Sequence, residues 1–404
     1  MKCVKCLIIF TLSIIIMFSS VLFASAEELP NDDDWQWRVF ENESVDAIIT
    51  ENTLDPKCKT AILIEAETGT VLYEKNADKR VPIASVTKIM TLLLAMEAID
   101  NNVISMSDII TISETAASMG GSQAYMEVGE QLSMEEILKS VVVASANDGA
   151  VALAEHISGS IGAFVELMNQ KATSLGMTNT LFLNPTGLDD AQDPYSSARD
   201  VAIMSRELLK YPLILNYTTI WTDSIRNGKF SLANTNKLIR FYPNANGLKT
   251  GSTSKAKYCL SASAKRNDMQ LISVILGADS SNDRFSGAKS LLDYGFATYA
   301  FYSPEKYTPD KIRVWGGTAQ YITPKLDLNG LLTNKSDINK ITTKVELETD
   351  LIAPVDKNQV VGKYTFYLGD EILKEIPIFA NESVEKATLW DIFRSLLKLF
   401  FCQK

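Results

Sequence analysis

The stretch Ser85-Val-Thr-Lys-Ile-Met-Thr-Leu-Leu-Leu-Ala-Met96 is the most apolar helical pattern in the predicted first domain of this 404-residue chain. Its apolar residues cover more than one face of the helix predicted over residues 85–99, which indicates a helix buried in the middle of a domain. Ser85 stands at the positive end of the helix dipole, and Lys88 lies one turn later on the same face. If burial and nearby positive charge depress the pKa of Lys88, its neutral amine can accept the Ser85 proton and create a nucleophile. Taken alone, a serine and a lysine at this spacing also occur by chance in many proteins.

Outward from this helix, strand patterns alternate with helix patterns. Two apolar runs, 61–64 and 70–73, flank the turn Glu67-Thr-Gly69 and predict a hairpin. Ser133 and Glu136 form a capping box that starts a helix. Further segments are predicted as a helix toward Ile157, a helix over 198–209, strands over 256–264 and 270–276, and a helix over 286–299. Strands before and after a block of helices indicate an α+β domain around an antiparallel sheet.

Two further short clusters carry side chains suited to proton transfer and anion binding. Ser145-Ala-Asn147 lies in a predicted break between helices, where a hydroxyl can relay a proton and an amide can hold a carbonyl. The alternative for this cluster is a helix N-cap before Asp148. Lys249-Thr-Gly-Ser252 enters a predicted strand, where lysine and a hydroxyl can clamp a carboxylate and glycine lets a substrate backbone approach. The alternative is a plain turn and edge strand.

The composition narrows the chemistry further. The chain contains one histidine, His156, so multi-histidine zinc sites cannot form and a Ser-His-Asp hydrolase would have to use this residue. We expect His156 to be a structural or surface residue, and we expect neither a metal nor a cofactor. The formal net charge of −10 becomes −12 once the two lysines of the leader described below are removed. An acidic chain of this kind disfavours nucleic-acid binding through a basic surface.

The first 26 residues have the pattern of a secretory signal peptide. Two lysines precede an apolar run over 7–23, and Ala24-Ser-Ala26 supplies a small-residue cleavage site. We expect cleavage after Ala26, and the alternative is an uncleaved membrane anchor. Residues 27–56 are acidic and turn-rich, which predicts a poorly ordered N-terminal segment before structure begins near Thr60.

Three cysteines lie beyond this leader, Cys58, Cys259 and Cys402, and they are odd in number and widely spaced. They predict neither a disulfide framework nor a metal motif. Cys259 lies in an alternating apolar run, which is typical of a small core residue rather than of a nucleophile.

The composition changes after residue 302. Short alternating runs over 303–380, such as Lys344–Glu348 and Tyr364–Leu368, predict a small all-β domain. In the last segment, 381–404, a narrow polar stripe between residues 389 and 401 stands against a wide apolar and aromatic face. This pattern predicts an amphipathic helix that lies in a membrane interface, and the alternative is a helix packed on the protein's own core.

The three polar clusters together are far more specific than any one of them. Class A β-lactamases and penicillin-binding proteins carry a Ser-x-x-Lys, a Ser-Asp-Asn and a Lys-Thr-Gly element. Over roughly 57–380 this chain resembles the serine-type D-Ala-D-Ala carboxypeptidases, the low-molecular-weight penicillin-binding proteins of peptidase family S11. The segments that carry the resemblance are Ala84–Thr91, Ser145–Asp148, Asn184–Asp189, Asn234–Lys237 and Gly247–Gly251. It implies a penicillin-binding-protein/β-lactamase-like domain over 57–302, followed by that family's C-terminal β domain and membrane anchor.

The resemblance also implies catalytic roles. Ser85 would attack the carbonyl of the terminal D-Ala-D-Ala bond and form an acyl-enzyme, with Lys88 as the general base. Ser145 would pass a proton toward the departing D-alanine amine, and Asn147 would orient the substrate.

Substrate binding would fall to the third cluster. Lys249 and Thr250 would hold the terminal carboxylate, beside Gly251. Backbone N–H groups of Ser85 and Ser252 would form the oxyanion hole, where charge develops in the tetrahedral intermediate. Ser252 departs from the family pattern, in which a larger residue such as histidine often follows Lys-Thr-Gly.

The expected activity is removal of the terminal D-alanine from peptidoglycan pentapeptide stems, outside the cytoplasmic membrane of a bacterium. The expected partners are stem peptides ending in D-Ala-D-Ala, β-lactam antibiotics as inhibitors, and the membrane surface through the C-terminal helix. The alternatives are a D,D-endopeptidase or transpeptidase, a β-lactamase, and a non-catalytic penicillin-binding sensor. A class A β-lactamase needs a deacylating glutamate, and Glu166 with Asn169 has the wrong spacing, so we interpret it as a solvated helix position.

Overall fold

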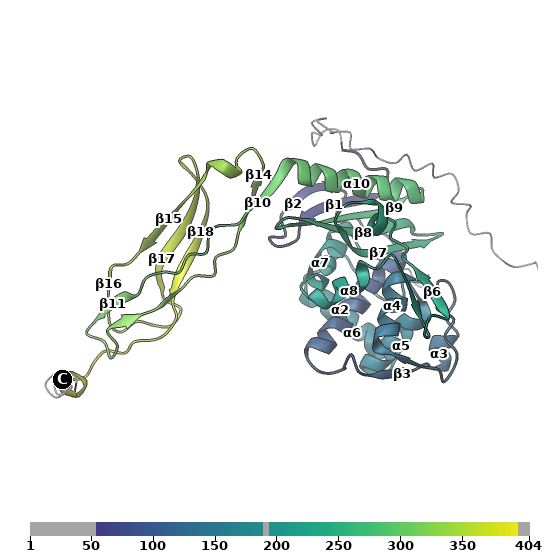
Figure 1. Cartoon of the computed structure of the whole chain (residues 1–404), viewed down its shortest axis with the longest axis horizontal. Coiled ribbons are helices and arrows are strands. Elements are labelled where there is room, and N and C mark those ends of the chain that lie inside the picture. Colours follow the sequence, from purple (N-terminus) through teal and green to yellow (C-terminus); the bar gives the residue numbers. More distant parts are fainter. Residues whose placement is uncertain (1–53, 189–193, 395–404) are drawn as a thin grey trace, which may run out of the picture. The chain divides into compact units, whose positions relative to one another are not determined.

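The computed structural model describes residues 54–188 and 194–394 (Figure 1). The predicted signal peptide, most of the acidic N-terminal segment and Cys402 lie outside the described residues. The first strand, β1 (Thr60–Glu65), starts where structure was expected to begin. It forms the predicted hairpin with β2 (Val71–Lys75), in which Leu63 lies opposite Tyr73.

A five-stranded antiparallel sheet organises the larger part of the chain. Its strand order is β2-β1-β9-β8-β7, so that β7 lies at one edge. The strands added to the hairpin are β7 (Ala245–Thr253), β8 (Lys257–Arg266) and β9 (Met269–Ala278). The pairing of β1 with β9 joins segments at opposite ends of this part of the chain. The predicted α+β architecture around an antiparallel sheet is confirmed.

Alternation along the strands gives this sheet two apolar faces. Ala61 and Leu63 of β1 pack into the cluster beneath α10 (Ser281–Thr298), whereas Ile62 and Ile64 join the core of the helical region on the opposite face. Successive side chains of a strand point to opposite faces, so a single strand supplies both layers.

The helical region is built around α2 (Lys88–Asp100), which follows the 3-10 turn η3 (Ala84–Thr87). The helix predicted over 85–99 therefore begins with one tighter turn. All side chains from Ile89 to Met96 are buried, which confirms the expected burial on more than one face. The same region contains α3 (Glu114–Ala117), α4 (Met134–Val143), α5 (Asn147–Ser158), α6 (Ile161–Ser174), α7 (Ala198–Leu208), η4 (Pro212–Ile214), α8 (Leu215–Thr218), and the hairpins β3 (Ile109–Thr111) with β4 (Gln131–Ser133) and β5 (Thr222–Ile225) with β6 (Phe230–Ala233). The short helix α9 (Leu238–Phe241) instead places Leu238 in the apolar cluster beneath α10. Figure 1 shows α10 on one side of the sheet and α2, α4, α5, α6, α7 and α8 on the other side.

Capping residues set the helix boundaries. Ser133 and Glu136 form the predicted capping box at the start of α4. α10 begins earlier than the predicted residue 286 because Ser280 caps it by accepting the Asp283 N–H. The interruption predicted between two helices is present, since α4 ends at Val143 and α5 begins at Asn147.

The C-terminal part of the described chain is all β, as predicted. β10 (Tyr299–Tyr302) pairs with β14 (Leu331–Asn334). Two further sheets share one apolar cluster, to which Val314 and Val361 both belong. The first sheet contains β12 (Tyr321–Ile322), β11 (Ile312–Trp315) and β16 (Asp350–Ile352), and the second contains β13 (Pro324–Lys325), β18 (Glu371–Ala380), β17 (Val360–Leu368) and β15 (Ile341–Leu347), with η5 (Ile338–Lys340) before β15.

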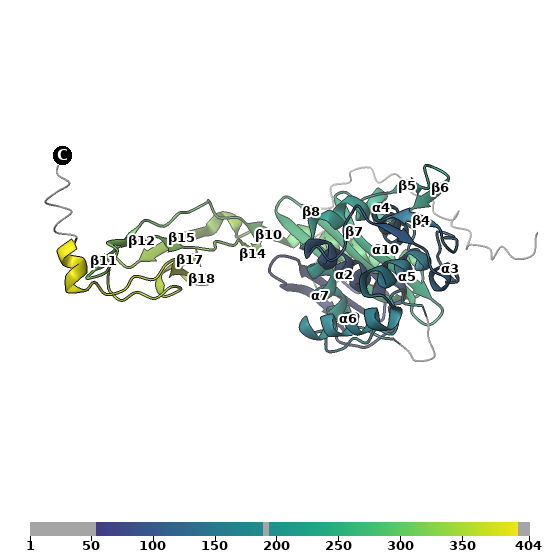
Figure 2. The ribbon, with the colours of Figure 1, turned by 90° about the horizontal axis from the view of Figure 1, so that it is seen from below.

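A helix begins after this β part at Leu389 and is described as far as Arg394 (Figure 2). The rest of the predicted amphipathic helix lies outside the described residues. Within residues 54–188 and 194–394 no single helix is long and apolar enough to span a membrane, although α5 and α6, bent by 84° at their junction, pass that test as a pair.

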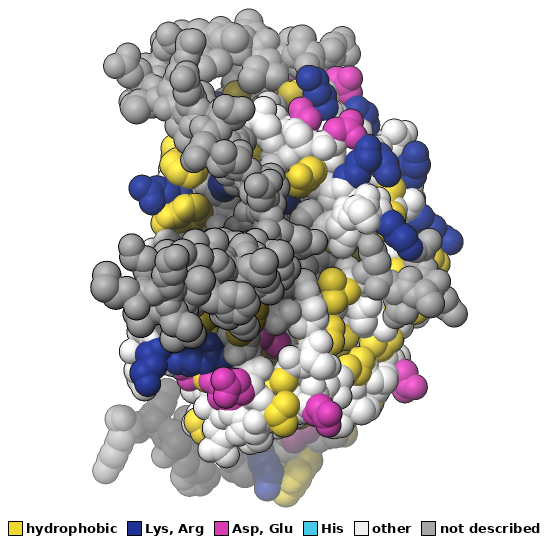
Figure 3. Space-filling view, turned by 90° about the vertical axis from the view of Figure 1, so that its right-hand side faces the viewer, with side chains coloured by type: hydrophobic (Ala, Val, Ile, Leu, Met, Phe, Trp, Pro, Cys, Tyr) yellow, Lys and Arg dark blue, Asp and Glu magenta, His cyan; other side chains and the backbone are white. Residues whose placement is uncertain are grey.

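Charge is unevenly distributed over the surface. On the face seen in Figure 3, several Lys and Arg side chains gather along the upper right margin, with others at the left and at the bottom, and Asp and Glu side chains lie both near the top and in the lower half. The formal net charge of −10 therefore does not make every face of the molecule acidic.

Candidate active site

Ser85 lies in the η3 turn, where the chain enters the buried helix α2. Its side chain is half-buried, whereas Lys88, one turn later, is fully buried. The helix thus carries the lysine into the core and leaves the serine at the edge of the solvent.

Three oxygen atoms surround Lys88 Nζ. They are Ser85 Oγ at 2.9 Å, Asn147 Oδ1 at 2.6 Å and the Thr186 carbonyl oxygen at 2.9 Å. The carboxamide and carbonyl oxygens can only accept hydrogen bonds, while a hydroxyl can also donate. A neutral amine that donates to Asn147 and Thr186 therefore keeps its lone pair for the Ser85 hydroxyl.

The surroundings of Lys88 favour that neutral form. The pKa of Lys88 is lowered well below its ordinary value, first because burial withdraws the ammonium from water and second because Lys249 adds a like charge. The Asp148 carboxylate opposes both effects. Its oxygens are engaged by backbone N–H groups of Ala124, Met126 and Gly149. The balance leaves Lys88 suited to act as a base.

Asn147 is the first residue of α5, and the N-cap position is occupied by Ala146. The side chains of Ser145 and Asn147 therefore do not cap this helix. The Asn147 carboxamide is engaged at both ends, because Oδ1 accepts from Lys88 and Nδ2 donates to the Gly120 carbonyl at 2.7 Å. Ser145 lies in the break before it with a positive φ of 62° and is 4% exposed. Asn147 thereby anchors the second cluster against the first.

The Asn184–Gly187 turn contributes a contact that the sequence motifs did not predict. Asn184 Oδ1 accepts hydrogen bonds from the backbone N–H groups of Thr186 and Gly187, which shapes the turn so that the Thr186 carbonyl reaches Lys88. Gly187 has a φ of +78°, and a Cβ there would lie 1.9 Å from the Ala84 carbonyl oxygen. The turn therefore packs directly against η3. This segment was part of the family resemblance, but a backbone carbonyl leaves no signature in the sequence.

Lys249 and Thr250 lie on the edge strand β7 and are both buried. Lys249 Nζ donates to the Thr250 carbonyl at 3.1 Å. Burial and, to a smaller extent, the positive charge of Arg284 lower the pKa of Lys249 to about 7. The Thr250 hydroxyl lies 2.6 Å from the hydroxyl of Thr235, within the Asn234–Lys237 segment.

Gly251 allows a contact within the protein that the sequence did not predict. A Cβ at this position would lie 2.7 Å from the Ile83 carbonyl oxygen and 2.9 Å from the Ser85 backbone nitrogen. The glycine therefore lets the protein's own η3 turn approach β7. The approach of a substrate backbone to this glycine stays a prediction. Ser252, the next residue, is exposed and pairs with Tyr258 of β8.

Sequence reasoning missed Arg284, a buried cation that lies behind β7. Arg284 of α10 is 7% exposed, and its Nη1 lies 3.3 Å from the carbonyl oxygens of both Gly251 and Cys259. It supports β7 from behind and lowers the pKa of Lys249 through its charge. An isolated arginine in a helix carries no sequence signal for such a role.

The remaining candidates lie apart from this cluster. His156 Nε2 is 2.9 Å from Asp108 Oδ2 in a partly exposed pair. Glu166 is exposed on α6, as expected for a solvated helix position. Cys259 is fully buried in the core, also as expected.

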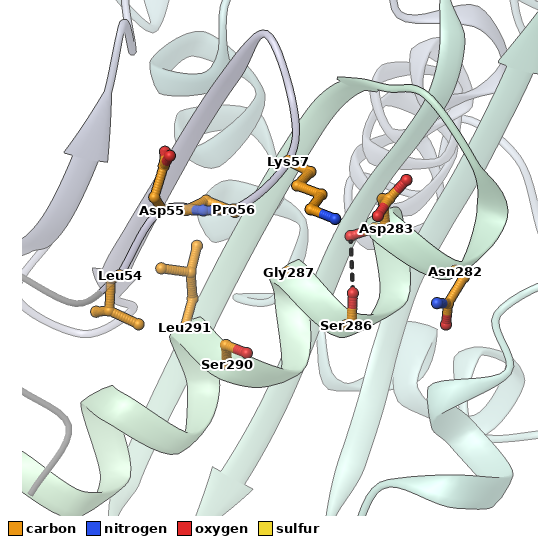
Figure 4. Close-up of a pocket in the computed structure, with 10 residues that line it drawn as sticks. All are labelled: Leu54, Asp55, Pro56, Lys57, Asn282, Asp283, Ser286, Gly287, Ser290 and Leu291. Carbon is orange, nitrogen blue, oxygen red and sulfur yellow. Dashed lines mark hydrogen bonds between the residues drawn. The ribbon is translucent and has the colours of Figure 1, made fainter.

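A cavity of about 490 Å³ lies between the segment 54–57 and the first turns of α10 (Figure 4). Its wall includes Asp283, whose carbonyl accepts a hydrogen bond from Ser286. None of the motif residues lines it. The cavity therefore lies away from the polar cluster formed where η3, α5 and β7 meet.

The fold and this cluster define the class of penicillin-binding proteins. The family model described as D-alanyl-D-alanine carboxypeptidase matches residues 47–280, and the model for the C-terminal domain of penicillin-binding protein 5 matches residues 296–386. The chain belongs to the D-alanyl-D-alanine carboxypeptidase family. It is a serine-type D-Ala-D-Ala carboxypeptidase, and the predicted family and activity are confirmed.

Individual relatives agree with this assignment. The chain is 44% identical over 338 residues to the D-alanyl-D-alanine carboxypeptidase DacF of Bacillus subtilis, covering 82% of this chain and 87% of the relative. Among solved structures, penicillin-binding protein 5 from Haemophilus influenzae is 31% identical with a TM-score of 0.72, covering 82% of this chain and 98% of the other. Penicillin-binding protein D2 from Listeria monocytogenes in its ampicillin-bound form is 32% identical with a TM-score of 0.55, covering 59% and 98%.

Proposed function

We propose that Ser85 is the acylated nucleophile of this carboxypeptidase and that neutral Lys88 takes its proton. The observation that carries this proposal is the 2.9 Å contact between Lys88 Nζ and Ser85 Oγ, made while two acceptor-only oxygens engage the other sides of the amine. The chain's single histidine lies on another surface, paired with Asp108. Lysine thus replaces histidine as the base.

In the first step Ser85 Oγ attacks the carbonyl carbon of the terminal D-Ala-D-Ala bond while its proton passes to Lys88. The tetrahedral intermediate then collapses as the peptide C–N bond breaks, and the proton held by Lys88 passes through Ser145 to the leaving amine, which leaves Lys88 neutral again. The products of this step are free D-alanine and an ester on Ser85. Water hydrolyses the ester, which releases the shortened stem peptide and restores Ser85.

Lys249 and Thr250 are proposed to hold the substrate's terminal carboxylate. The Thr250 hydroxyl donates to Thr235 Oγ1 at 2.6 Å, which holds Thr250 Oγ1 in place, and its proton would turn to the carboxylate when the substrate binds. A substrate carboxylate beside Lys249 would raise the pKa of this lysine and stabilise its charged form. The charged form of Lys249 is therefore most stable when the substrate carboxylate is bound.

The oxyanion would be stabilised by backbone N–H groups of Ser85 and Ser252. Support comes from the close packing at Gly251, where the Ser85 nitrogen lies within 2.9 Å of a Cβ position on β7. The backbone of the nucleophile thus faces the edge strand beside Ser252. Asn147 is proposed to orient the substrate's amide as well as Lys88, through the second proton of Nδ2.

The test compares wild-type protein with Ser85→Ala and Ser85→Thr. Wild-type protein should release D-alanine from a peptide ending in D-Ala-D-Ala and should be labelled covalently by fluorescent penicillin. Ser85→Ala should lose both, because no oxygen remains to form the ester. A cross-linked dimer of stem peptides, assayed in parallel, measures D,D-endopeptidase activity. D-alanine release or labelling that persists in Ser85→Ala would contradict the proposal.

We also propose that the chain is exported and held at the membrane surface by its last segment. The domains are proposed as a signal peptide over 1–26, an acidic segment over 27–56, a peptidase domain over 57–302, a β domain over 303–380 and an anchoring helix over 381–404. The β-lactam and stem-peptide partners follow from the family, whose members act on the cell wall outside the cytoplasm.

The start of the proposed anchor supports this role. Thr388 and Asp391 cap the helix reciprocally, because each side chain accepts a hydrogen bond from the other residue's backbone N–H. Leu389 and Trp390 are 87% and 62% exposed, and the rings of Trp390 and Phe393 stack with centroids 5.6 Å apart. Exposed aromatic side chains on an amphipathic helix suit the interface between lipid headgroups and acyl chains.

Deletion from Thr388 onward should move the mature protein from the membrane fraction to the soluble fraction. The paired substitution Trp390→Gln and Phe393→Gln should do so in part, while the exposed Tyr125→Gln serves as a control elsewhere on the surface. Fractionation unchanged by the deletion would contradict the anchor. N-terminal sequencing of the exported protein should begin at Glu27.

A further inference from the structure

A polar cavity of about 350 Å³ opens beside the end of β7, directly after the Lys-Thr-Gly segment. It is lined by Ser252, Thr253, Ser254, Lys257, Tyr258 and Asp279. These residues come from the end of β7, the start of β8 and the position after β9, which are neighbouring strands of the sheet. The cavity therefore lies at one end of the edge of the sheet that carries the proposed carboxylate site.

Two opposite charges stand on the wall of this cavity. Lys257 Nζ donates a hydrogen bond to Asp279 Oδ1. This hydrogen bond lowers the pKa of Asp279, which keeps the carboxylate ionised at neutral pH. The side chains of Lys257 and Asp279 are 43% and 75% exposed, so a solute can reach both charges. A carboxylate has two oxygens and can accept a second cation alongside Lys257.

One of the lining residues, Tyr258, is in contact with a buried cation. The guanidinium of Arg284 lies 5.4 Å from the centre of the Tyr258 ring, and the same group donates to the Gly251 carbonyl on β7. The buried cation thus contacts both the Tyr258 ring and the active-site strand. A ligand in the cavity would be positioned relative to Ser252 by the ends of β7 and β8 and the turn that joins them.

The proposed function determines which part of the substrate reaches this cavity. With the terminal carboxylate at Lys249 and Thr250 and the scissile carbonyl between Ser85 and Ser252, the peptide continues upstream past Ser252. An extended peptide can lie along β7 because it is an edge strand. At about 3.3 Å per extended residue, the residue before the two D-alanines comes next to the cavity.

We propose that this cavity, lined by residues 252–258 and Asp279, binds the side chain of the stem residue that precedes the two D-alanines. It favours a side chain that ends in both an amine and a carboxylate. The amine pairs with Asp279, the carboxylate pairs with Lys257, and the hydroxyl groups of the wall complete the hydrogen bonds. This inference rests on the proposed function, because the direction of the peptide comes from it.

The test uses acetyl-X-D-Ala-D-Ala peptides in which X is meso-diaminopimelyl, L-lysyl or L-norleucyl. D-alanine release gives kcat/KM for the wild-type protein and for the variants Asp279→Asn, Lys257→Met and Lys344→Met. Lys344→Met is the control, because it breaks an exposed ion pair with Glu346 in β15. The wild-type kcat/KM should be highest for the diaminopimelyl peptide, lower for the lysyl peptide and lowest for the norleucyl peptide. Asp279→Asn should lower kcat/KM about threefold to fivefold for the first two peptides, the scale of an exposed ion pair, and leave the norleucyl peptide unchanged.

Lys257→Met removes the positive charge and leaves Asp279, so it measures the contribution of Lys257 alone. It should lower kcat/KM for the diaminopimelyl peptide by a similar factor without lowering that of the lysyl or norleucyl peptide. Equal kcat/KM for the three peptides in wild-type protein would overturn the proposal. So would losses that are equal for all peptides and for acylation by benzylpenicillin, since they would report a general disturbance of β7. Failure of the proposed function would be distinguishable, because D-alanine release or penicillin labelling would then survive Ser85→Ala.

Discussion

Asn147 Oδ1 lies 2.6 Å from Lys88 Nζ, closer than Ser85 Oγ at 2.9 Å, and the same carboxamide donates to the Gly120 carbonyl. The nearest partner of the proposed base is therefore a neutral oxygen that is held in place from its other end. The neutrality matters because an anionic partner would favour the ammonium form of the lysine. The structure combines close hydrogen bonding with a lowered pKa, which a salt bridge at this position would prevent.

Asn147→Asp should raise the pKa of Lys88 by placing a carboxylate against its Nζ. Because each pKa unit changes the neutral fraction about tenfold, acylation by benzylpenicillin at pH 7 should fall at least about tenfold. The acid limb of the pH profile should move to higher pH, and part of the rate should return in alkaline buffer. Asn101→Asp, at the exposed end of α2, is the matched control and should change neither the rate nor the profile. A lower rate with an unmoved pH profile would contradict this account of Lys88.

Lys249→Met should stabilise the protein near neutral pH while abolishing efficient turnover. The pKa of Lys249 is about 7 in the folded protein against an ordinary value of 10.5, so between these values the unfolded chain binds more protons and the free energy of unfolding rises with pH. Below pH 7 the full cost of burying the charge remains. Methionine removes this cost, and the free energy of unfolding at pH 7 should increase by about 1 to 3 kcal/mol.

The gain from Lys249→Met should shrink as the pH approaches 10. Denaturant unfolding at pH 7 and pH 9 measures both the gain and its pH dependence. Lys139→Met is the control with the opposite sign, because the hydrogen bonds that Lys139 donates to Glu135 and Asp223 raise the pKa of Lys139, and its loss should not stabilise the protein. A gain that is independent of pH would mean that the cost of charge burial is not its cause.

Gly251→Ala should lower activity through the position of the nucleophile. Its Cβ would fall 2.7 Å from the Ile83 carbonyl oxygen and 2.9 Å from the Ser85 nitrogen, so η3 must move away from β7. A shift of this kind in a reacting group costs about 100-fold in kcat/KM. Gly162→Ala is the control, because a Cβ there meets nothing within 4 Å and the site lies on α6. Circular dichroism should show that both variants fold, and full activity in Gly251→Ala would contradict the tight contact.

His156→Gln should leave D-alanine release and its pH profile unchanged. The histidine pairs with Asp108 at 2.9 Å, with both side chains about one quarter to one third exposed. An exposed pair of this kind contributes less than about 1 kcal/mol to stability. Thermal unfolding should therefore show at most a small loss. A large fall in kcat would assign the only histidine a part in catalysis and contradict the lysine-based mechanism.

Local sequence signals predicted the elements that depend on near neighbours. The capping box of Ser133 and Glu136, the hairpin around Gly69 and the burial of α2 all follow from spacing within a few residues. Such features succeed because caps, turns and apolar periodicity act over one or two turns of chain. The helix α10 was predicted to begin too late because its polar first turn, capped by Ser280, lacks an apolar pattern.

For the candidate active site, the sequence predicted the residues but not the contacts between them. The three motifs named the residues, and the order in which they occur pointed to the family. Their mutual contacts join segments far apart in the chain, as in the hydrogen bond from Lys88 to Thr186 or the support of Gly251 by Arg284. A backbone carbonyl or an arginine behind a strand has no pattern that sequence reasoning can detect.

The sequence alone specifies a serine and a lysine one helical turn apart, a formal net charge of −10 and a single histidine. The packing of distant segments settles that Lys88 is fully buried, that two of its partners are neutral acceptor oxygens, and that Gly251 admits the nucleophile's own turn. The physical reason is that chemical identity is local, whereas the dielectric and the charges around a group depend on everything packed against it.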